Sequence, residues 1–184
     1  ITCRDWSSDV CSSDLPPLLP DTESDRLPEG ARSALPRVLA WLPGPRGLLL
    51  QGKTRIGKTR LLTLLTQKLV LSGRAVVAIR CDVLAERIRA AQKADGMDGA
   101  DEYRRRLAGA EVLWLDDLGK SRLREGEADF LWGLLDDRLA HGRPLLVTTE
   151  HDRASLLAKM AKAGADAGAA TIGRLLEMCA VVGL

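Results

Sequence analysis

One eight-residue segment constrains the fold of this chain more than any other. Residues 52–59 read Gly-Lys-Thr-Arg-Ile-Gly-Lys-Thr and fit the phosphate-binding pattern G-x-x-x-x-G-K-[ST]. The apolar segment 47–51 before it is typical of a buried parallel strand, and the leucine spacing of residues 60–69 predicts a helix. Strand, loop and helix follow in the order that a phosphate site requires, because backbone amides at a helix N-terminus can surround a phosphate.

The motif assigns a role to each of its parts. Lys58 is expected to reach the β- and γ-phosphates of a nucleotide, and Thr59 to give its hydroxyl to a magnesium ion. Backbone amides supply the remaining contacts. The residues predicted to bind the nucleotide are Gly52, Lys53, Thr54, Arg55, Ile56, Gly57, Lys58, Thr59 and Arg60.

A second segment carries two aspartates at the end of an apolar strand. Residues 111–119 read Glu-Val-Leu-Trp-Leu-Asp-Asp-Leu-Gly, with Asp116 and Asp117 at the tip. Strand tips in open α/β sheets face the ligand crevice, so carboxylates there can hold magnesium and polarise a water molecule. By themselves the two residues are also compatible with a surface Asp-Asp turn. A phosphate-binding loop in the same chain favours the nucleotide site.

The other segments complete an α/β pattern. Apolar runs predict strands at 75–81, 144–150 and 179–183, and helices are predicted at 31–42, 83–93, 125–139, 152–161 and 172–178. Asp82 and Thr171 are candidate N-caps. The polar stretch 94–101 and the low-complexity stretch 161–170 are interpreted as connections. Alternating strands and helices predict a parallel sheet covered on both faces.

The two ends of the chain differ in character. Residues 1–15 resemble a translated sequencing adapter without helical or strand periodicity, and residues 16–30 contain three prolines and are interpreted as an irregular leader. The predicted domain therefore covers residues 31–184. Leaving out residues 1–15 makes the chain slightly more basic than its formal net charge of +2. That balance permits a nucleic-acid surface but does not argue for one, and a mildly basic solvated face is the simpler explanation.

Composition restricts the environment of the protein. Cys81 and Cys179 lie in or beside apolar runs, without metal-ligand spacing, which indicates buried thiols and a reducing, cytoplasmic location. No apolar stretch approaches the roughly 20 residues needed to cross a bilayer, so no membrane association is expected.

Five motifs together resemble a known family. They are Leu-Leu-Leu-Gln-Gly-x4-Gly-Lys-Thr-Arg, Leu-Trp-Leu-Asp-Asp-Leu-Gly, Asp-Asp-Arg, Leu-Val-Thr-Thr and Gly-Arg-Leu-Leu-Glu. In this combination the chain, over about residues 35–184, resembles the DnaC/IstB-like AAA+ ATPases, which are bacterial helicase loaders and helpers of transposition. The resemblance implies a P-loop NTPase fold with a five-stranded parallel AAA+ sheet, helices on both faces and no separate helical lid. It also implies ATP and Mg²⁺ as cofactors.

The resemblance implies further roles at matching positions. Thr59 and Asp116 would hold Mg²⁺, and Asp117 stands where many relatives have the glutamate that orients the attacking water. Arg174 matches the arginine finger that reaches the γ-phosphate of a neighbouring subunit, which implies a homo-oligomer. An exposed helical arginine on an interface or in solvent is the alternative for Arg174. Thr149, or Thr148, would sense the γ-phosphate.

Three residues depart from the family pattern. Arg55 replaces a glycine of the loop, so that backbone is expected to do without a glycine at positive φ. Asp117 is one methylene shorter than glutamate. Glu150 stands where relatives usually have an asparagine, and its carboxylate would repel a phosphate unless it turned away or bonded through water. All three favour weak hydrolysis.

Two classes of function remain open. The first is a DNA-associated ATPase, an enzyme that loads a replicative helicase or assists a transposase, with single-stranded DNA as a further partner. Candidate DNA contacts are Arg104, Arg105, Arg106, Arg122 and Arg124, although a basic helix face is most often simply solvated. The second is a non-hydrolysing, nucleotide-gated adaptor that binds a DNA-processing partner. A decayed or truncated mobile-element gene is a third possibility.

Overall fold

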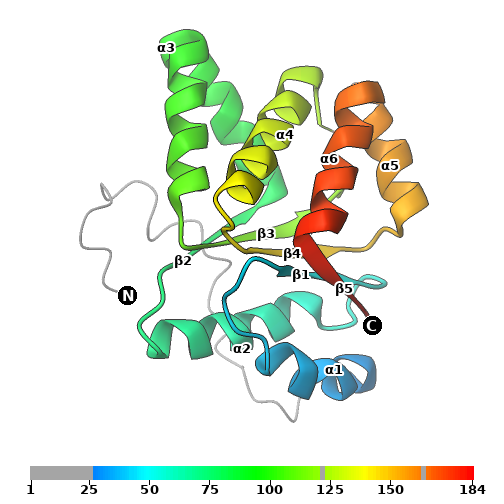
Figure 1. Cartoon of the computed structure of the whole chain (residues 1–184). Helices are drawn as coiled ribbons and strands as arrows, with labels where there is room; N and C mark the ends of the chain where they lie inside the picture. Colours follow the sequence, from blue (N-terminus) through cyan, green and yellow to red (C-terminus); the bar gives the residue numbers. More distant parts are fainter. Residues whose placement is uncertain (1–26, 121–122, 163–164) are drawn as a thin grey trace.

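The computed structural model describes residues 27–120, 123–162 and 165–184. It shows a five-stranded parallel sheet between two layers of helices (Figure 1). The predicted adapter segment and most of the predicted leader lie outside the described residues. The strands are β1 (Gly47–Gln51), β2 (Val76–Arg80), β3 (Val112–Leu118), β4 (Leu145–Thr149) and β5 (Cys179–Gly183). The helices are α1 (Glu29–Leu39), α2 (Lys58–Leu71), α3 (Cys81–Gly109), α4 (Glu125–Ala140), α5 (Arg153–Ala161) and α6 (Ala165–Met178).

The sheet has the strand order β2-β3-β4-β1-β5, and every neighbouring pair is parallel. The carboxyl ends of all five strands therefore lie at one edge. The position of β1, between β4 and β5, brings the loop after Gln51 next to the end of β4. This arrangement confirms the predicted fold class.

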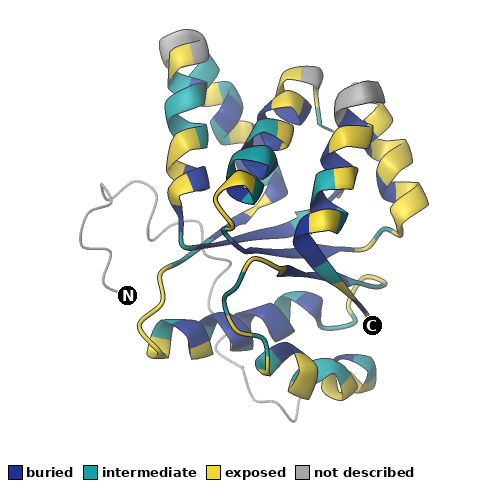
Figure 2. Cartoon of the chain, viewed as in Figure 1, coloured by how far each residue is buried: buried dark blue, intermediate teal, exposed yellow. Residues whose placement is uncertain are grey.

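Two apolar cores lie on opposite faces of the sheet (Figure 2). Leu48 and Leu50 of β1 pack with α1 and α2, whereas Leu49 packs with the layer of α3 to α6, as alternating strand side chains must. Because both faces are covered, β1, β3 and β4 are buried along almost their whole length. Cys81 and Cys179 are free, buried thiols, as predicted, and burial raises the pKa of Cys179 to about 12.

Two predicted connections are helical instead. The stretch 94–101 lies inside α3, which rises from the end of β2 and returns to the start of β3 (Figure 1). The stretch has two glycines, Gly96 and Gly99, and each costs a helix only about 1 kcal/mol, too little to end one rich in alanine and charged helix formers. Most of the stretch 161–170 belongs to α6, whose alanines are the strongest helix formers. Low complexity was therefore a misleading sign of a loop.

Helix starts also differ from the predictions. Thr171 does not cap a short helix but lies buried inside α6. Asp82 does not cap α3, because α3 begins one residue earlier and the Asp82 carboxylate pairs with the Arg80 guanidinium at 2.6 Å. The first helix, α1, begins at Glu29 instead of Ala31, so two residues assigned to the leader are helical.

Arg138 links three backbone segments at the edge of the sheet that lies opposite the phosphate loop. This fully buried guanidinium donates to Leu107 O at 3.0 Å, to Ala110 O at 2.8 Å and to Pro144 O. Its planar fork can satisfy several carbonyls at once, which a lysine could not. The end of α3 and the starts of β3 and β4 are thereby held in a fixed relation.

Candidate active site

The phosphate-binding loop connects β1 to α2 at the carboxyl edge of the sheet. Gly57, at the N-cap of α2, has φ 95°, and a Cβ there would lie 2.9 Å from the Ala31 Cβ. Only glycine fits that conformation and that space. Among the described residues no side chain caps α2, so the amides at its N-terminus are available to an anion.

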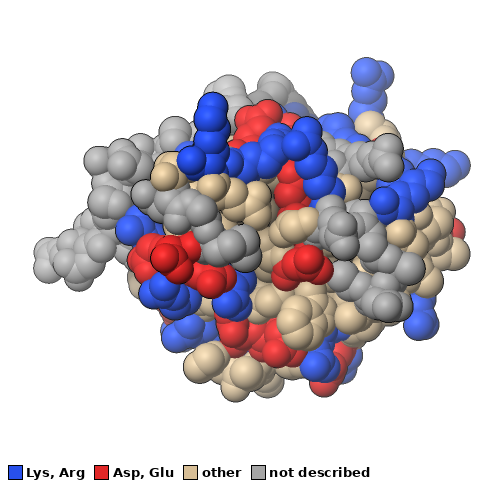
Figure 3. Space-filling model, turned by 90° about the horizontal axis from the view of Figure 1, so that it is seen from above, with Lys and Arg blue, Asp and Glu red and all other residues tan. Residues whose placement is uncertain are grey.

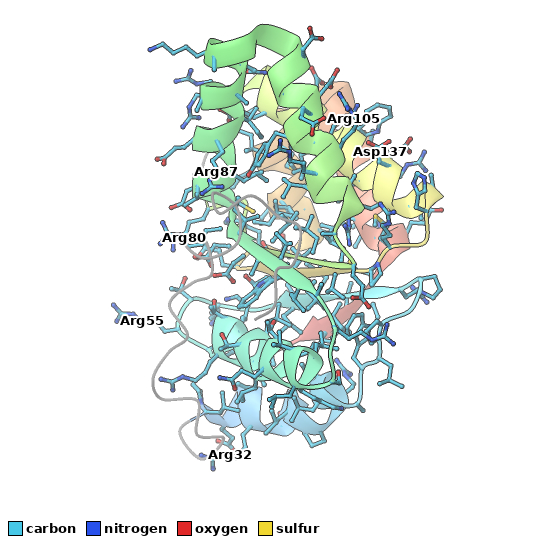
Figure 4. The ribbon with its side chains drawn as sticks, turned by 90° about the vertical axis from the view of Figure 1, so that its left-hand side faces the viewer. Arg32, Arg55, Arg80, Arg87, Arg105 and Asp137 are labelled. Atoms are coloured by element: carbon cyan, nitrogen blue, oxygen red, sulfur yellow. The ribbon has the colours of Figure 1, made fainter. Side chains whose placement is uncertain are left out.

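Arg55 adds a detail to the expectation about this loop. The backbone does without a glycine here, and Arg55 itself adopts the left-handed conformation, at φ 65°. This conformation is unfavourable by about 1–2 kcal/mol for a residue with a Cβ. Its side chain is exposed and projects away from the body of the protein (Figure 4). The loop therefore keeps the backbone path of a glycine at the expense of strain.

Lys58 lies inside the loop. Its ammonium donates to Gly52 O and Lys53 O, each at 2.8 Å, and its side chain is buried. Burial lowers the pKa of Lys58, while the carboxylates of Asp117, Glu150 and Asp116 act in the opposite direction. The amine is thus held where a phosphate bound by the loop amides would meet a positive charge.

Thr59 and Asp116 meet although 57 residues separate them in the sequence. The Thr59 hydroxyl donates to Asp116 Oδ1 at 3.1 Å, and the Thr148 hydroxyl donates to the same oxygen at 2.6 Å. Asp116 is 3% exposed. Burial raises the pKa of this carboxyl, and the hydrogen bond from Thr148 opposes the rise. The two residues predicted to hold a metal therefore stand side by side.

Asp117 is arranged differently from its neighbour. It has φ 58° and lies in an irregularity of the β3–β4 pairing between Leu115 and Leu118. Its N–H donates to the Thr148 hydroxyl at 2.8 Å, and its carboxylate accepts from Lys120 Nζ at 2.7 Å. The bulge turns the Asp117 carboxylate toward solvent, where it is 34% exposed.

Thr148 thus connects both aspartates, a role that the sequence pattern did not reveal. The hydroxyl of Thr149 points elsewhere: it donates to Leu118 O at 2.8 Å and accepts from His151 N. The structure therefore places Thr149 against the end of β3, whereas Thr148 faces Asp116. Lys120 is a second contact that was missed, although its position three residues after Asp117 is a usual spacing for an ion pair.

The other predicted loop residues lie around this centre. Lys53, Thr54 and Arg55 are exposed, whereas Ile56 is partly buried and lies near Gly52 and Gly30. Arg60 lies in the first turn of α2. Thr54 makes a contact that was not predicted: its hydroxyl donates to Glu150 Oε2 at 2.6 Å.

Arg174 lies apart from the phosphate loop of its own chain. It is on α6, five residues before Cys179, and Cys179 pairs with Gly47 at the first residue of β1. That is the opposite end of the sheet from the loop. Its guanidinium pairs with Asp136 of α4 at 2.9 Å and its side chain is 39% exposed. This exposed position is compatible with both interpretations of Arg174, a residue that reaches a neighbouring subunit and a surface arginine.

The predicted DNA contacts carry acidic partners. Arg104 pairs with Asp137 and Asp101, and both Arg105 and Arg106 pair with Glu102. Basic and acidic side chains are interspersed on the face formed by α3 to α6 (Figure 3). Arg122 lies outside the described residues, and Arg124 is the N-cap of α4.

Comparison with known proteins decides the family. Residues 33–184 match the family model described as IstB-like ATP binding protein. The chain belongs to this family. A relative from Pseudomonas fluorescens, named as a protein of insertion sequence IS1162, is 33% identical over 110 residues. That match covers 60% of this chain and 46% of the relative, so it spans about half of the relative's length.

Solved structures confirm the fold of this IstB-like chain. The crystal structure of DnaI has a TM-score of 0.73 at 20% identity, covering 90% of this chain and 92% of that one. The crystal structure of the DnaC helicase loader gives 0.62 at 19% identity, covering 97% and 99%. AMPPCP-bound DnaA from Aquifex aeolicus gives 0.67 at 17% identity, covering 91% and 51%. The predicted DnaC/IstB-like AAA+ architecture is confirmed.

Within residues 27–120, 123–162 and 165–184, every helix is too short or too polar to span a lipid bilayer.

Proposed function

We propose that this IstB-like protein is a DNA-associated, Mg²⁺-dependent ATPase that loads or remodels a partner protein, with bound ATP as the switch. The observation that carries the proposal is the contact between Thr59 and Asp116 beneath the phosphate loop. It joins the two elements that the motifs predicted separately, at the carboxyl edge of the sheet. Family membership supports ATP as the nucleotide.

The donor set fits a magnesium ion. Thr59 and Asp116 offer oxygen atoms, which hard divalent cations prefer, and Mg²⁺ commonly takes one or two protein ligands with phosphates and water completing its shell. In keeping with this, the described residues contain no group of three or more His, Cys, Asp or Glu side chains that could hold a metal alone. When bound, Mg²⁺ would neutralise charge on the phosphates.

The protein residues would act mainly by positioning and by charge. Lys58, already inside the loop, would pair with the β- and γ-phosphates. Asp117 would orient the attacking water once its carboxylate leaves Lys120. Arg174 of one subunit would reach the γ-phosphate bound by its neighbour in a homo-oligomer, a contribution worth roughly 10³–10⁵ in rate where such arginines are known.

The relatives support a role on DNA. One relative belongs to an insertion sequence, and one solved structure of similar fold is a helicase loader. We infer that the partner is a transposase or a replicative helicase and that single-stranded DNA is bound as well. The identity of the gene beside this one, transposase or helicase, distinguishes the two partners.

ATP turnover by the purified full chain tests the proposal. Phosphate release should require Mg²⁺, rise with single-stranded DNA, and disappear in Lys58→Ala, because that variant lacks the cation of the loop. A Lys58→Ala protein that hydrolyses ATP as fast as the unaltered chain would refute the proposal.

A non-hydrolysing adaptor is the second candidate. Two contacts favour it: Lys120 holds the Asp117 carboxylate, and Thr54 holds the Glu150 carboxylate at the phosphate loop. Such an adaptor would bind a fluorescent ATP analogue but release no phosphate, even with DNA and the partner present. Turnover in those conditions would exclude it.

A further inference from the structure

Glu150 occupies a place that matters for any ligand of the phosphate loop. Strand β4 pairs with β1 so that Thr149 lies beside Gln51, and Gly52 N–H donates to Thr149 O at 3.2 Å. The residue after Thr149 therefore lies directly beside the first residues of the loop. The two strands fix this position through their backbones, independently of any side chain.

The side chain of Glu150 is turned onto the loop itself. Its Oε2 accepts from the Thr54 hydroxyl at 2.6 Å, which is a short, charge-assisted hydrogen bond. That hydrogen bond lowers the pKa of Glu150, so the group is ionised at neutral pH. A full negative charge is thus held against the segment whose amides and lysine are arranged for phosphates.

The two lysines that act on the charge of Glu150, Lys58 and Lys159, donate their hydrogen bonds to backbone carbonyls and not to this carboxylate. Lys58 Nζ donates to Gly52 O and Lys53 O, and Lys159 Nζ donates to Gly119 O at 2.9 Å. Among the described residues no lysine or arginine lies within ion-pair distance of Glu150, and the Nε2 atom of His151 lies 3.5 Å from its Oε1. The three acidic groups near Lys58 therefore differ in their partners. Asp116 accepts hydrogen bonds from the hydroxyls of Thr59 and Thr148. Asp117 forms an ion pair with Lys120, whereas Glu150 accepts a hydrogen bond from the Thr54 hydroxyl.

We propose that Glu150 is a specificity-determining residue that weakens binding of the γ-phosphate. With Glu150 in place, the affinity of the site for a nucleoside diphosphate, relative to its affinity for the triphosphate, is higher than with a neutral residue at this position. The inference rests on the proposed nucleotide site. A triphosphate differs from a diphosphate by an extra anionic group, and Lys58 is the residue that meets this group. A carboxylate on the same loop repels it, whereas the shorter diphosphate avoids most of that repulsion.

The size of the effect follows from like charges in a partly screened site. A tenfold change in relative affinity corresponds to about 1.4 kcal/mol. Two like charges a few ångströms apart near a protein surface readily repel by that amount. Glu150→Gln removes the charge but keeps an oxygen that can accept from Thr54, so the loop contact survives.

The test compares two nucleotides on the full chain at constant Mg²⁺. Dissociation constants for ADP and for a β,γ-methylene ATP analogue are measured by titration calorimetry for the unaltered protein and Glu150→Gln. Asp152→Asn is the matched control: it removes a nearby charge, but Asp152 caps α5 through Ser155 N, and asparagine caps equally well.

Glu150→Gln should raise the preference for the analogue over ADP by about tenfold or more, mainly through the analogue, while Asp152→Asn leaves the preference unchanged. Glu150→Asn should shift it in the same direction and serves if the glutamine variant fails to fold. A preference that stays within about twofold in a folded neutral variant, or that moves toward ADP, overturns the inference. If the unaltered protein binds neither nucleotide, the proposed function fails as well.

Discussion

Thr148 offers the sharpest test of how the site is held together. Its hydroxyl is fully buried, donates to Asp116 Oδ1 at 2.6 Å and accepts from Asp117 N at 2.8 Å. Thr148→Val keeps the shape of the side chain, because it replaces the hydroxyl with a methyl group of similar size. The Asp117 N–H and one oxygen of the buried Asp116 carboxylate then each lose a partner.

The cost can be estimated from those two losses. An unsatisfied buried N–H costs about 1–3 kcal/mol, and a hydrogen bond to a charged group contributes about 1.5–3 kcal/mol. Asp116 keeps its bond from Thr59, so the lower half of the combined range applies, or about 3 kcal/mol of the free energy of unfolding. For a chain of this size each kcal/mol moves the Tm by about 2–4 °C, so the Tm should fall by roughly 6–12 °C.

Calorimetry on the unaltered chain, Thr148→Val and Thr148→Ser measures this directly. Serine restores the hydroxyl without the methyl group, so it should recover most of the loss. If Thr148→Val unfolds within about 0.5 kcal/mol of the unaltered chain, or if serine is no better than valine, the hydroxyl does not organise the two aspartates.

Two further substitutions probe the strain and the burial at the site. Burial raises the pKa of Asp116 in the folded state, so this carboxyl contributes fully to the free energy of unfolding below its unfolded pKa of about 3.8. That contribution is lost as the pH rises through the folded pKa. Asp116→Asn lacks this loss, and its Tm relative to the unaltered chain should therefore increase between about pH 4 and pH 7; a difference that stays flat or shrinks would contradict the assignment. Arg55→Gly removes the cost of a non-glycine residue at φ 65°, so urea titration should show stabilisation of up to about 1 kcal/mol, less the greater freedom that glycine gives the unfolded chain; a clear loss of stability would show that Arg55 is not strained.

The fold and the halves of the site were predictable because each depends on contiguous residues. The phosphate loop, the apolar strand ending in Asp116 and Asp117, and β5 are all visible as short patterns, and the structure places the loop next to the aspartates. Their joining also follows from a general rule, that parallel strands present their carboxyl ends at one edge. The Thr59–Asp116 contact was therefore foreseeable.

What escaped prediction depends on contacts between distant segments or on helix propensity. The bond from Thr54 to Glu150 spans 96 residues and exists because Thr149 pairs with Gln51 in the sheet. A sequence pattern contains no such register. The alanine-rich start of α6 also differs from the prediction, because a low-complexity segment composed of strong helix formers can be a helix as well as a loop.

Backbone strain was the other unforeseen feature. Arg55 and Asp117 adopt positive φ although neither is glycine. Asp117 does so in the bulge that separates its carboxylate from that of Asp116. For Arg55 the loop path prevails over the preference of the residue, since the amides before α2 have to follow a fixed course.

Equilibrium binding of ATP to the full chain tests the central claim most directly. Titration calorimetry with and without Mg²⁺ on the unaltered protein and on Lys58→Ala compares the loop with its own cation removed. The unaltered protein should bind ATP, more tightly with Mg²⁺, and Lys58→Ala should bind at least about tenfold more weakly. Equal binding by Lys58→Ala, or binding that Mg²⁺ does not affect, would contradict a site built from the phosphate loop, Thr59 and Asp116.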